Sequence, residues 1–254
     1  MRLGRTPPDD ARRTGEAPTD LVYPPREDSL LLLPFARVAP GGSVLEVGAG
    51  RGLVARAAAR AGARVVATDL NPHALRSLRR ESLAEGLDLS VVRTDLARGL
   101  GRFDRILSNP PYLPTRADER DPDRWHDLAL NGGRDGCRVL ARLIRSLPDH
   151  LTVSGEAYVV VSSVQSAAGL EAIRTRWAAL GGRCEVVAER ALEGERLEVW
   201  RLTLVAAPRG PSAPAPPLPG PRRGSGGRPR NLRGRPAGSS REPGRGRTRV
   251  PDGA

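Results

Sequence analysis

Short apolar runs alternate with longer segments of helix-like apolar spacing along most of the chain. Apolar runs bounded by Gly, Pro or polar residues are typical of buried strands. They predict strands at residues 43–47, 63–68, 87–93, 103–107, 156–162, 183–189 and 196–205. A helix of about ten residues is predicted to begin near Leu30 and end near Pro40. Further helices are predicted over residues 53–61, 72–85, 137–150 and 167–180.

The alternation of strands and helices predicts an α/β fold with a mostly parallel sheet and helices on both faces. Only Leu192-Glu193-Gly194-Glu195 separate the last two strands, which indicates an antiparallel hairpin at one sheet edge. Residues 113–131 are polar and predict a long loop, and such loops are often lids or substrate-binding segments.

The two ends of the chain differ in composition from the part between them. Residues 1–20 are polar and rich in Pro, and we expect them to be flexible. Residues 206–254 consist mainly of Pro, Gly, Ser and Arg and are expected to be disordered. This tail has eleven Arg and two acidic residues, a net charge of +9, so the rest carries only +3 of the chain's +12. One folded domain is therefore predicted over residues 21–205.

The cysteines and the apolar runs bear on location. Cys137 and Cys184 lie far apart and have no partner at metal-ligand spacing, so we expect reduced thiols, no metal site and a cytoplasmic protein. The longest apolar run, Leu30 to Leu33, is too short to span a bilayer, and the N-terminus shows no signal peptide. No membrane association is expected.

A glycine-rich loop, Gly48-Ala49-Gly50-Arg51-Gly52, lies between a predicted strand and a predicted helix, with Glu46 just before it. Such a loop allows close approach of a ligand to backbone amides. The next strand ends in Asp69, about 20 residues further on, where an acid in α/β nucleotide sites binds ribose hydroxyls. The alternative for Asp69 is a helix cap, because Asn71-Pro72 opens the following helix.

Another acid, Asp95, follows the third strand and precedes Leu96. Asp95 could accept a hydrogen bond from an adenine amino group while Leu96 packs on the ring, and a solvated loop Asp is the alternative. Open parallel sheets bind ligands at the carboxyl ends of their strands. The acids and the glycine-rich loop are therefore expected to meet at one rim.

The stretch Asn109-Pro110-Pro111-Tyr112 ends the fourth strand. Two prolines make a stiff, extended turn, because neither can donate to a sheet and each restricts the residue before it. Amide and carbonyl oxygens in such a turn can accept the hydrogens of a planar NH2 group, and a ring can stack on its plane. The alternative is a proline turn that only closes a loop.

Together, residues 46–52, Asp69, Asp95 and the Asn-Pro-Pro-Tyr motif resemble a class I S-adenosylmethionine-dependent methyltransferase with a Rossmann-like sheet. In such enzymes this motif is shared by those that methylate a planar nitrogen. Residues 23–32 and the turn at 131–136, Asn-Gly-Gly-Arg-Asp-Gly, are similar to the HemK/PrmC glutamine N5-methyltransferases, in their short eukaryal and archaeal branch. Residues 158–163 and 195–199 also fit that branch.

The resemblance implies S-adenosylmethionine as cofactor and assigns roles to individual residues. The cofactor-binding residues would be Ser29, Glu46, Gly48, Gly50, Asp69, Asp95, Leu96 and Asn109. The catalytic residues would be Asn109, Pro110, Pro111 and Tyr112, which hold the substrate amide. Glu46 and the glycine-rich loop would face the methionine part, Asp69 the ribose, and Asp95 with Leu96 the adenine. Arg51 departs from the small residue that the family tends to have in this loop.

The implied substrate is the glutamine of a Gly-Gly-Gln motif in a peptide chain release factor, and a small activator subunit is allowed. A nucleic-acid base methyltransferase, acting on adenine N6 or guanine N2, remains an alternative, because the Arg-rich tail could contact RNA non-specifically. The glycine-rich loop and Asp69 alone would also permit an NAD-dependent oxidoreductase, which the Asn-Pro-Pro-Tyr motif and the hairpin do not suit. A non-catalytic RNA- or ribosome-binding protein that works through its tail is the third alternative.

Overall fold

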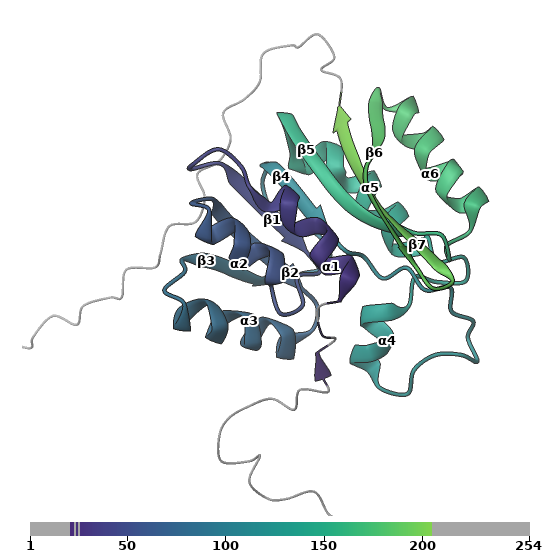
Figure 1. Ribbon diagram of the computed structural model, residues 1–254, viewed down its shortest axis with the longest axis horizontal. Helices are drawn as coiled ribbons and strands as arrows, with labels where there is room; N and C mark the ends of the chain where they lie inside the picture. The colour runs from purple at the N-terminus through teal and green to yellow at the C-terminus, as the bar shows by residue number, and fades with distance from the viewer. Residues whose placement is uncertain (1–20, 23, 25, 205–254) are drawn as a thin grey trace, which may run out of the picture. The chain divides into compact units, whose positions relative to one another are not determined.

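The computed structural model describes residues 21, 22, 24 and 26–204, which fold around a seven-stranded sheet (Figure 1). The strands are β1 (Ser43–Val47), β2 (Arg64–Asp69), β3 (Leu89–Arg93), β4 (Phe103–Ser108), β5 (Leu151–Ser162), β6 (Gly182–Leu192) and β7 (Glu195–Leu204). Their order in the sheet is β3-β2-β1-β4-β5-β7-β6. Neighbours from β3 to β5 pair in parallel, and β7 is antiparallel to both β5 and β6. The predicted mostly parallel sheet with a C-terminal hairpin is confirmed.

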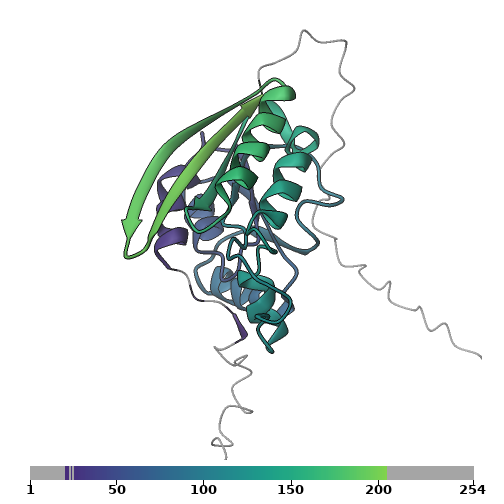
Figure 2. The same ribbon diagram turned by 90° about the vertical axis from the view of Figure 1, so that its right-hand side faces the viewer.

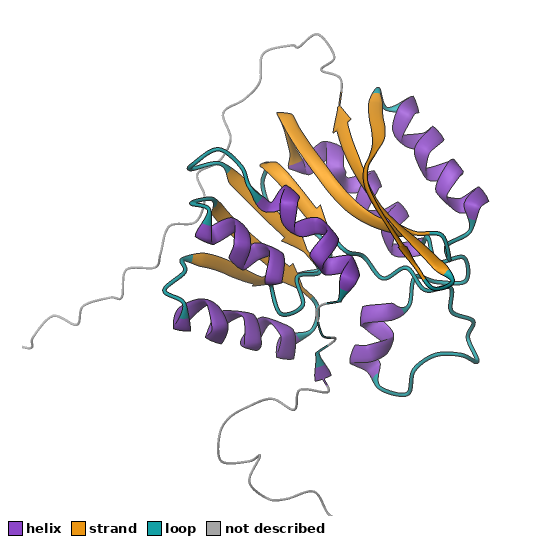
Figure 3. Cartoon of the chain, in the orientation of Figure 1, coloured by secondary structure: helices purple, strands orange, loops and turns teal. Residues whose placement is uncertain are grey.

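Helices cover both faces of this sheet (Figures 1 and 3). One face carries α1 (Glu27–Leu32), the 3-10 helix η3 (Leu33–Ala36), α2 (Leu53–Arg60) and α3 (Pro72–Ala84). Figure 2 looks towards the other face, which is covered by α5 (Arg138–His150) and α6 (Ala167–Ala179). The short helix α4 (Arg124–Leu130) precedes α5. Helices on two faces leave the carboxyl ends of the strands open for a ligand.

The central strand β1 shows why the sequence predicts this sheet so clearly. Every residue of β1 is buried, because the strand lies between β2 and β4 and is covered on both faces. Val44 packs into the core with α2, whereas Leu45 and Val47 pack into the core with α5. A strand buried on both faces has a continuous apolar run rather than an alternating pattern.

Three segments differ most from the sequence prediction, and the turn between β6 and β7 is shorter than predicted, because Leu192 ends β6 and Glu195 begins β7. Residues 113–131 are not loop throughout, because α4 forms at Arg124–Leu130. The first helix is shorter than predicted: α1 ends at Leu32 and the chain continues as a 3-10 helix, since Pro34 has no N–H to extend the α-helical pattern. Strand β5 begins at Leu151, directly after α5, rather than at residue 156. The predictions for residues 1–20, 205 and the tail lie outside the described residues.

Candidate active site

The carboxyl ends of the central strands meet at one rim and are held there by two buried hydroxyl groups. Val47 at the end of β1 pairs with Thr68 of β2 and with Ser108 of β4. The Ser108 hydroxyl donates to the Val47 carbonyl at 2.8 Å, and the Thr68 hydroxyl donates to the Leu96 carbonyl at 2.9 Å. The first bond links the end of β4 to the end of β1, and the second links β2 to the loop after β3. The sequence alone assigned no role to Thr68 or Ser108.

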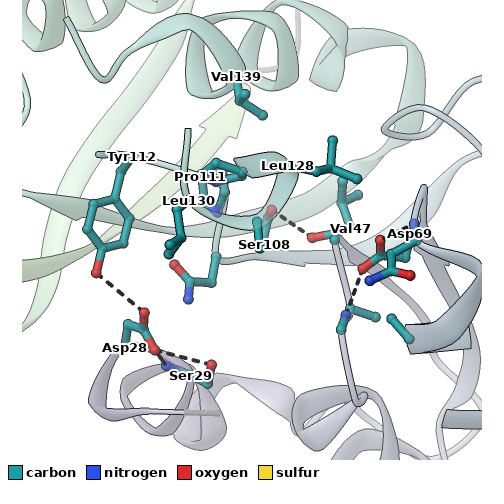
Figure 4. A pocket seen from close by; sticks show the side chains of 18 of the residues that line it. Asp28, Ser29, Val47, Asp69, Ser108, Pro111, Tyr112, Leu128, Leu130 and Val139 are labelled. Carbon is teal, nitrogen blue, oxygen red and sulfur yellow. Dashed lines mark hydrogen bonds between the residues drawn. The ribbon is translucent and has the colours of Figure 1, made fainter. Parts of the chain in front are cut away.

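A cavity of about 740 Å³ opens at this rim, and Figure 4 shows part of its lining. This volume is within the range of small-molecule sites. The structure places every predicted site residue along the cavity: Ser29, Glu46, Gly48, Gly50, Asp69, Asp95, Leu96, Asn109, Pro110, Pro111 and Tyr112. Their roles in binding and catalysis stay predictions.

The glycine-rich loop between β1 and α2 needs the conformational freedom of glycine. Gly48, Gly50 and Gly52 have φ angles of +70°, +54° and +71°, in the left-handed region that side chains disfavour. A Cβ atom on Gly52 would lie 2.1 Å from Leu78 Cδ1, so the loop packs closely on α3. No atom would lie within 4 Å of a Cβ on Gly48 or Gly50. The loop therefore forms an open cradle beside the cavity.

Asp69 ties this loop to the end of β2. One carboxylate oxygen accepts the Gly50 N–H at 2.9 Å, and the other accepts the Asn71 N–H at 2.8 Å (Figure 4). The N-cap of α3 is Asn71, whose side chain accepts the His73 N–H, so helix capping is not the main task of Asp69. Burial raises the pKa of Asp69. Each oxygen keeps a second lone pair with which to accept a ligand hydroxyl.

Glu46 is a carboxyl group enclosed by the protein. Its side chain is only 6% exposed and accepts the Ala55 N–H of α2 at 2.7 Å. Burial raises the pKa of Glu46 to about 8, and the nearby Asp69 contributes in the same direction. A carboxyl group in this state is a suitable partner for a ligand cation, because pairing would offset the cost of its ionisation.

Asp95 and Leu96 form the part of the rim after β3. Leu96 has a φ of +54°, the one non-glycine residue with positive φ in the described chain. Asp95 forms an ion pair with Arg142 of α5, and both side chains line the cavity. Asp95 is therefore paired with Arg142 rather than only solvated. The sequence alone did not identify this partner. One carboxylate oxygen of Asp95 is used in this pair.

The Asn-Pro-Pro-Tyr turn carries an unsatisfied acceptor on Asn109, a residue that lines the cavity. Asn109 Oδ1 is buried and has no hydrogen-bond partner among the described residues. The Tyr112 hydroxyl lies 3.4 Å from one carboxylate oxygen of Asp28, and the other oxygen accepts the Ser29 N–H at 2.6 Å (Figure 4). The Asp28 side chain is buried. Helix α1 is thus connected to the turn through Asp28, another residue that sequence reasoning did not single out.

The Asn-Gly-Gly-Arg-Asp-Gly turn at residues 131–136 packs directly behind this motif. The Gly132 N–H donates to the Leu113 carbonyl at 2.9 Å, and the Leu113 N–H donates to the Leu130 carbonyl at 3.0 Å. A Cβ atom on Gly136 would lie 2.4 Å from the Tyr112 carbonyl oxygen. Glycine is required here because two backbones approach each other closely.

Helix α4 contributes a wall of the cavity, with Arg124, Trp125, Leu128 and Leu130 among the lining residues. Asp123 caps the helix by accepting the N–H groups of Trp125 and His126. The Trp125 ring meets the His73 ring of α3 edge-on at 5.8 Å, and the Arg124 guanidinium lies 4.0 Å from the Trp125 centroid. The segment predicted as a lid or substrate-binding loop therefore reaches across the cavity towards α3.

The described residues contain no group of three or more His, Cys, Asp or Glu side chains that could hold a metal ion. In the same part of the chain, no helix has both the length and the apolar character needed to cross a membrane.

Comparisons with known proteins agree with this geometry. The family model "Methyltransferase small domain" matches residues 27–125. A putative protein N5-glutamine methyltransferase of Methanocaldococcus jannaschii is 37% identical over 186 residues, which cover 71% of this chain and 92% of that protein. The release factor glutamine methyltransferase of Deinococcus radiodurans is 44% identical over 119 residues, 44% of this chain and 42% of that enzyme. Mouse methyltransferase HEMK2 is 36% identical over 152 residues, 55% of this chain and 71% of that protein.

Solved structures show the same fold. A chain of the E. cuniculi Mtq2–Trm112 complex, described as responsible for methylation of the eRF1 translation termination factor, matches with a TM-score of 0.57 and 24% identity, over 73% of this chain and 99% of that one. A T. thermophilus 16S rRNA N2 G1207 methyltransferase in complex with AdoMet and guanosine matches with a TM-score of 0.52 and 22% identity, over 72% of this chain and 44% of that one. The class I methyltransferase fold is thereby confirmed.

Proposed function

Because the chain belongs to the HemK/PrmC-type family of protein N5-glutamine methyltransferases, we propose that it methylates the side-chain amide of the glutamine in a Gly-Gly-Gln motif of a peptide chain release factor, with S-adenosylmethionine as methyl donor. The single observation that carries the proposal is the buried, unpartnered Oδ1 of Asn109, a residue that lines the same cavity as the glycine-rich loop. An unsatisfied buried acceptor is costly in a folded protein, which supports a ligand donor as its partner.

The residues present fit S-adenosylmethionine. The open cradle at Gly48 and Gly50 leaves room for the methionine part, and Glu46 would pair with its ammonium group. Asp69 would accept the ribose hydroxyls with its remaining lone pairs. The free oxygen of Asp95 would accept the adenine amino group, with Leu96 against the ring.

The Asn-Pro-Pro-Tyr turn would hold the substrate amide flat. Asn109 Oδ1 would accept one hydrogen of the amide and the Pro110 carbonyl the other, which fixes the plane of the nitrogen. Pro111 and Tyr112 would wall the amide, and the Tyr112–Asp28 contact limits rotation of the ring. The two acceptors also favour the positive charge that develops on nitrogen as the transfer proceeds.

The main task of the active site is to align the substrate amide with the methyl donor. S-adenosylmethionine would supply an electrophilic methyl group on a cationic sulfur. Transfer would form the nitrogen–carbon bond, break the sulfur–carbon bond with both electrons staying on sulfur, and release one amide proton to water. An amide nitrogen is a weak nucleophile, so alignment at near-attack distance carries most of the rate enhancement. Methylation makes the departing proton acidic, and the turn therefore needs no strong base beside it.

A labelled-methyl assay tests the proposal. Purified protein and radiolabelled S-adenosylmethionine would be incubated with release factor, with a variant release factor whose motif glutamine is alanine, with DNA and with RNA. Label on the intact release factor, mapped to the glutamine amide and absent from the variant, is the expected result. Label on nucleic acid alone would contradict this proposal and show that the protein methylates bases instead.

Two further partner predictions accompany this function. A small activator subunit, as in the complex that contains Trm112, predicts low activity of the isolated chain and a gain on addition of the subunit. Non-specific RNA contact is predicted for the Arg-rich tail, whose residues lie outside the described part of the chain. A cytoplasmic location likewise stays a prediction.

A further inference from the structure

A second cavity, of about 390 Å³, is lined by residues of α5 and α6. These two helices cover the face of the sheet away from α1, α2 and α3. The cavity floor is apolar and includes the buried side chains of Ile144, Ile173 and Trp177. At the end of α6, Leu180 is 52% exposed beside the same cavity. We call this feature the α5–α6 groove. An apolar floor that reaches the surface is suited to a side chain from a partner.

The edges of the α5–α6 groove are positively charged. Arg145 of α5 and Arg176 of α6 border it from opposite sides, and both are exposed. Neither has an ion pair or hydrogen bond with another described residue. The acid in the lining, Asp135, accepts the Cys137 N–H at 2.9 Å at the start of α5. Two unpaired guanidinium groups on either side of an apolar floor complement a segment that carries carboxylates and an apolar side chain.

The α5–α6 groove adjoins the active-site cavity at the start of α5. Arg138 lines both spaces, and Val139 and Arg142 line the active site, whereas Ala141 and Arg145 line the groove. Successive positions on the first turns of one helix therefore face two neighbouring depressions. A polypeptide with one residue in the active site can reach the groove by crossing a single helix.

We propose that the α5–α6 groove binds an acidic segment of the polypeptide substrate while the target glutamine of the same substrate lies at Asn109. This inference rests on the proposed function and adds where the substrate is held outside the reacting centre. The groove would lower KM for a whole protein substrate and leave the chemical step unchanged, because Arg145 and Arg176 lie outside the active-site lining.

The test compares two double variants on two substrates. Arg145→Glu with Arg176→Glu reverses the groove charges, and Arg79→Glu with Arg80→Glu makes the same charge change on α3, on the opposite face. KM and kcat would be measured for full-length release factor and for a short synthetic peptide that contains Gly-Gly-Gln. We expect the groove variant to raise KM for the protein by about tenfold or more, with kcat and the peptide kinetics within twofold of wild type. The α3 variant should match wild type on both.

Several outcomes would overturn the inference. They are an unchanged KM for the protein, an equal rise in the α3 variant, or an equal rise for the short peptide. As a direct probe, poly-L-glutamate should inhibit wild type on the protein substrate and lose this effect in the groove variant; stronger inhibition by poly-cytidylate would point to RNA instead. If wild type labels only nucleic acid, the proposed function fails, and the groove inference fails with it.

Discussion

The carboxylate of Asp69 accepts the backbone N–H of Gly50 at 2.9 Å, so the end of β2 holds the loop that follows β1. Asp69→Ala should loosen this loop and remove the expected ribose acceptor. We expect the Kd for S-adenosylhomocysteine to rise by about 10- to 100-fold, since hydrogen bonds to charged groups contribute roughly 1.5–3 kcal/mol. Isothermal titration calorimetry measures this directly. The exposed Asp88 provides the control, because Asp88→Ala should leave the Kd unchanged. Equal binding by both variants would contradict the role of Asp69.

Alanine substitutions at Gly52 and Gly62 distinguish the cost of backbone strain from the cost of steric overlap. Both have positive φ, +71° and +85°, but a Cβ atom would meet Leu78 at 2.1 Å on Gly52 and nothing within 4 Å on Gly62. Gly62→Ala should cost about 1–2 kcal/mol in the free energy of unfolding from φ alone. Gly52→Ala should cost about 1–3 kcal/mol more, because the added methyl group would overpack the core at Leu78 of α3. Urea unfolding measures both, and equal costs would argue against the close packing of the loop on α3.

Glu46 should make the ligand-free protein less stable as pH rises. Its pKa is raised from 4.5 to about 8, so between these values the folded protein holds a proton that the unfolded chain releases. The protonated Glu46 therefore contributes stability that is complete below about pH 4.5 and is lost as pH approaches 8. The free energy of unfolding should fall by at most about 1.4 kcal/mol per pH unit. Glu46→Gln should remove the slope.

Urea unfolding of wild type and Glu46→Gln at several pH values between 5 and 8 checks this prediction. The variant should gain stability relative to wild type as pH rises. Glu189→Gln, at an exposed position of β6, is the matched control and should follow wild type throughout. Parallel stability curves for wild type and Glu46→Gln would show that the carboxyl group is ionised in the folded protein.

The sheet was predictable because its central strands have a strong local signature. β1 is buried on both faces, so its apolar run stands out between polar and glycine-rich segments. The start of β5 was missed because Leu151 follows α5 without a turn signal between helix and strand. Helix α4 was missed because it is a single short amphipathic stretch in a polar segment, and only its Asp123 cap marks the beginning.

Some residues of the candidate site could likewise be predicted from the sequence, and others could not. Asp69 and Asn109 are recognisable because they follow strands at positions where parallel sheets bind ligands. Asp28 and Arg142 were not recognisable, because each acquires its place through a partner far away in the chain, Tyr112 and Asp95 respectively. A contact between distant segments has no local pattern, so it appears only when the fold brings the segments together.

Asp95 should determine recognition of the adenine amino group. Wild type is expected to bind S-adenosylhomocysteine about tenfold more tightly than S-inosylhomocysteine, in which a carbonyl replaces that amino group. Asp95→Ala should bind the two ligands within about twofold of each other, because the acceptor is gone. Asp118→Ala, at an exposed position, serves as control and should keep the preference. A preference retained in Asp95→Ala would mean that another group reads the adenine.

Asn109 distinguishes a substrate-holding turn from a turn that only closes a loop. Its Oδ1 atom is buried without a partner among the described residues, so Asn109→Ala removes an unsatisfied acceptor from the folded protein. The free energy of unfolding should therefore stay equal or increase. If the oxygen holds the substrate amide, kcat should fall by about 100- to 1,000-fold, the scale seen when one preorganised transition-state contact is removed.

Three measurements on Asn109→Ala decide between the two interpretations: urea unfolding, calorimetric binding of S-adenosylhomocysteine, and single-turnover methyl transfer to release factor. A large loss of kcat, with stability retained and the Kd within about threefold of wild type, supports amide positioning. A turn that only closes a loop predicts a loss of stability with kcat retained in the folded fraction. Equal losses in binding and turnover would place Asn109 at the cofactor alone, since uniform loss of binding does not single out the transition state.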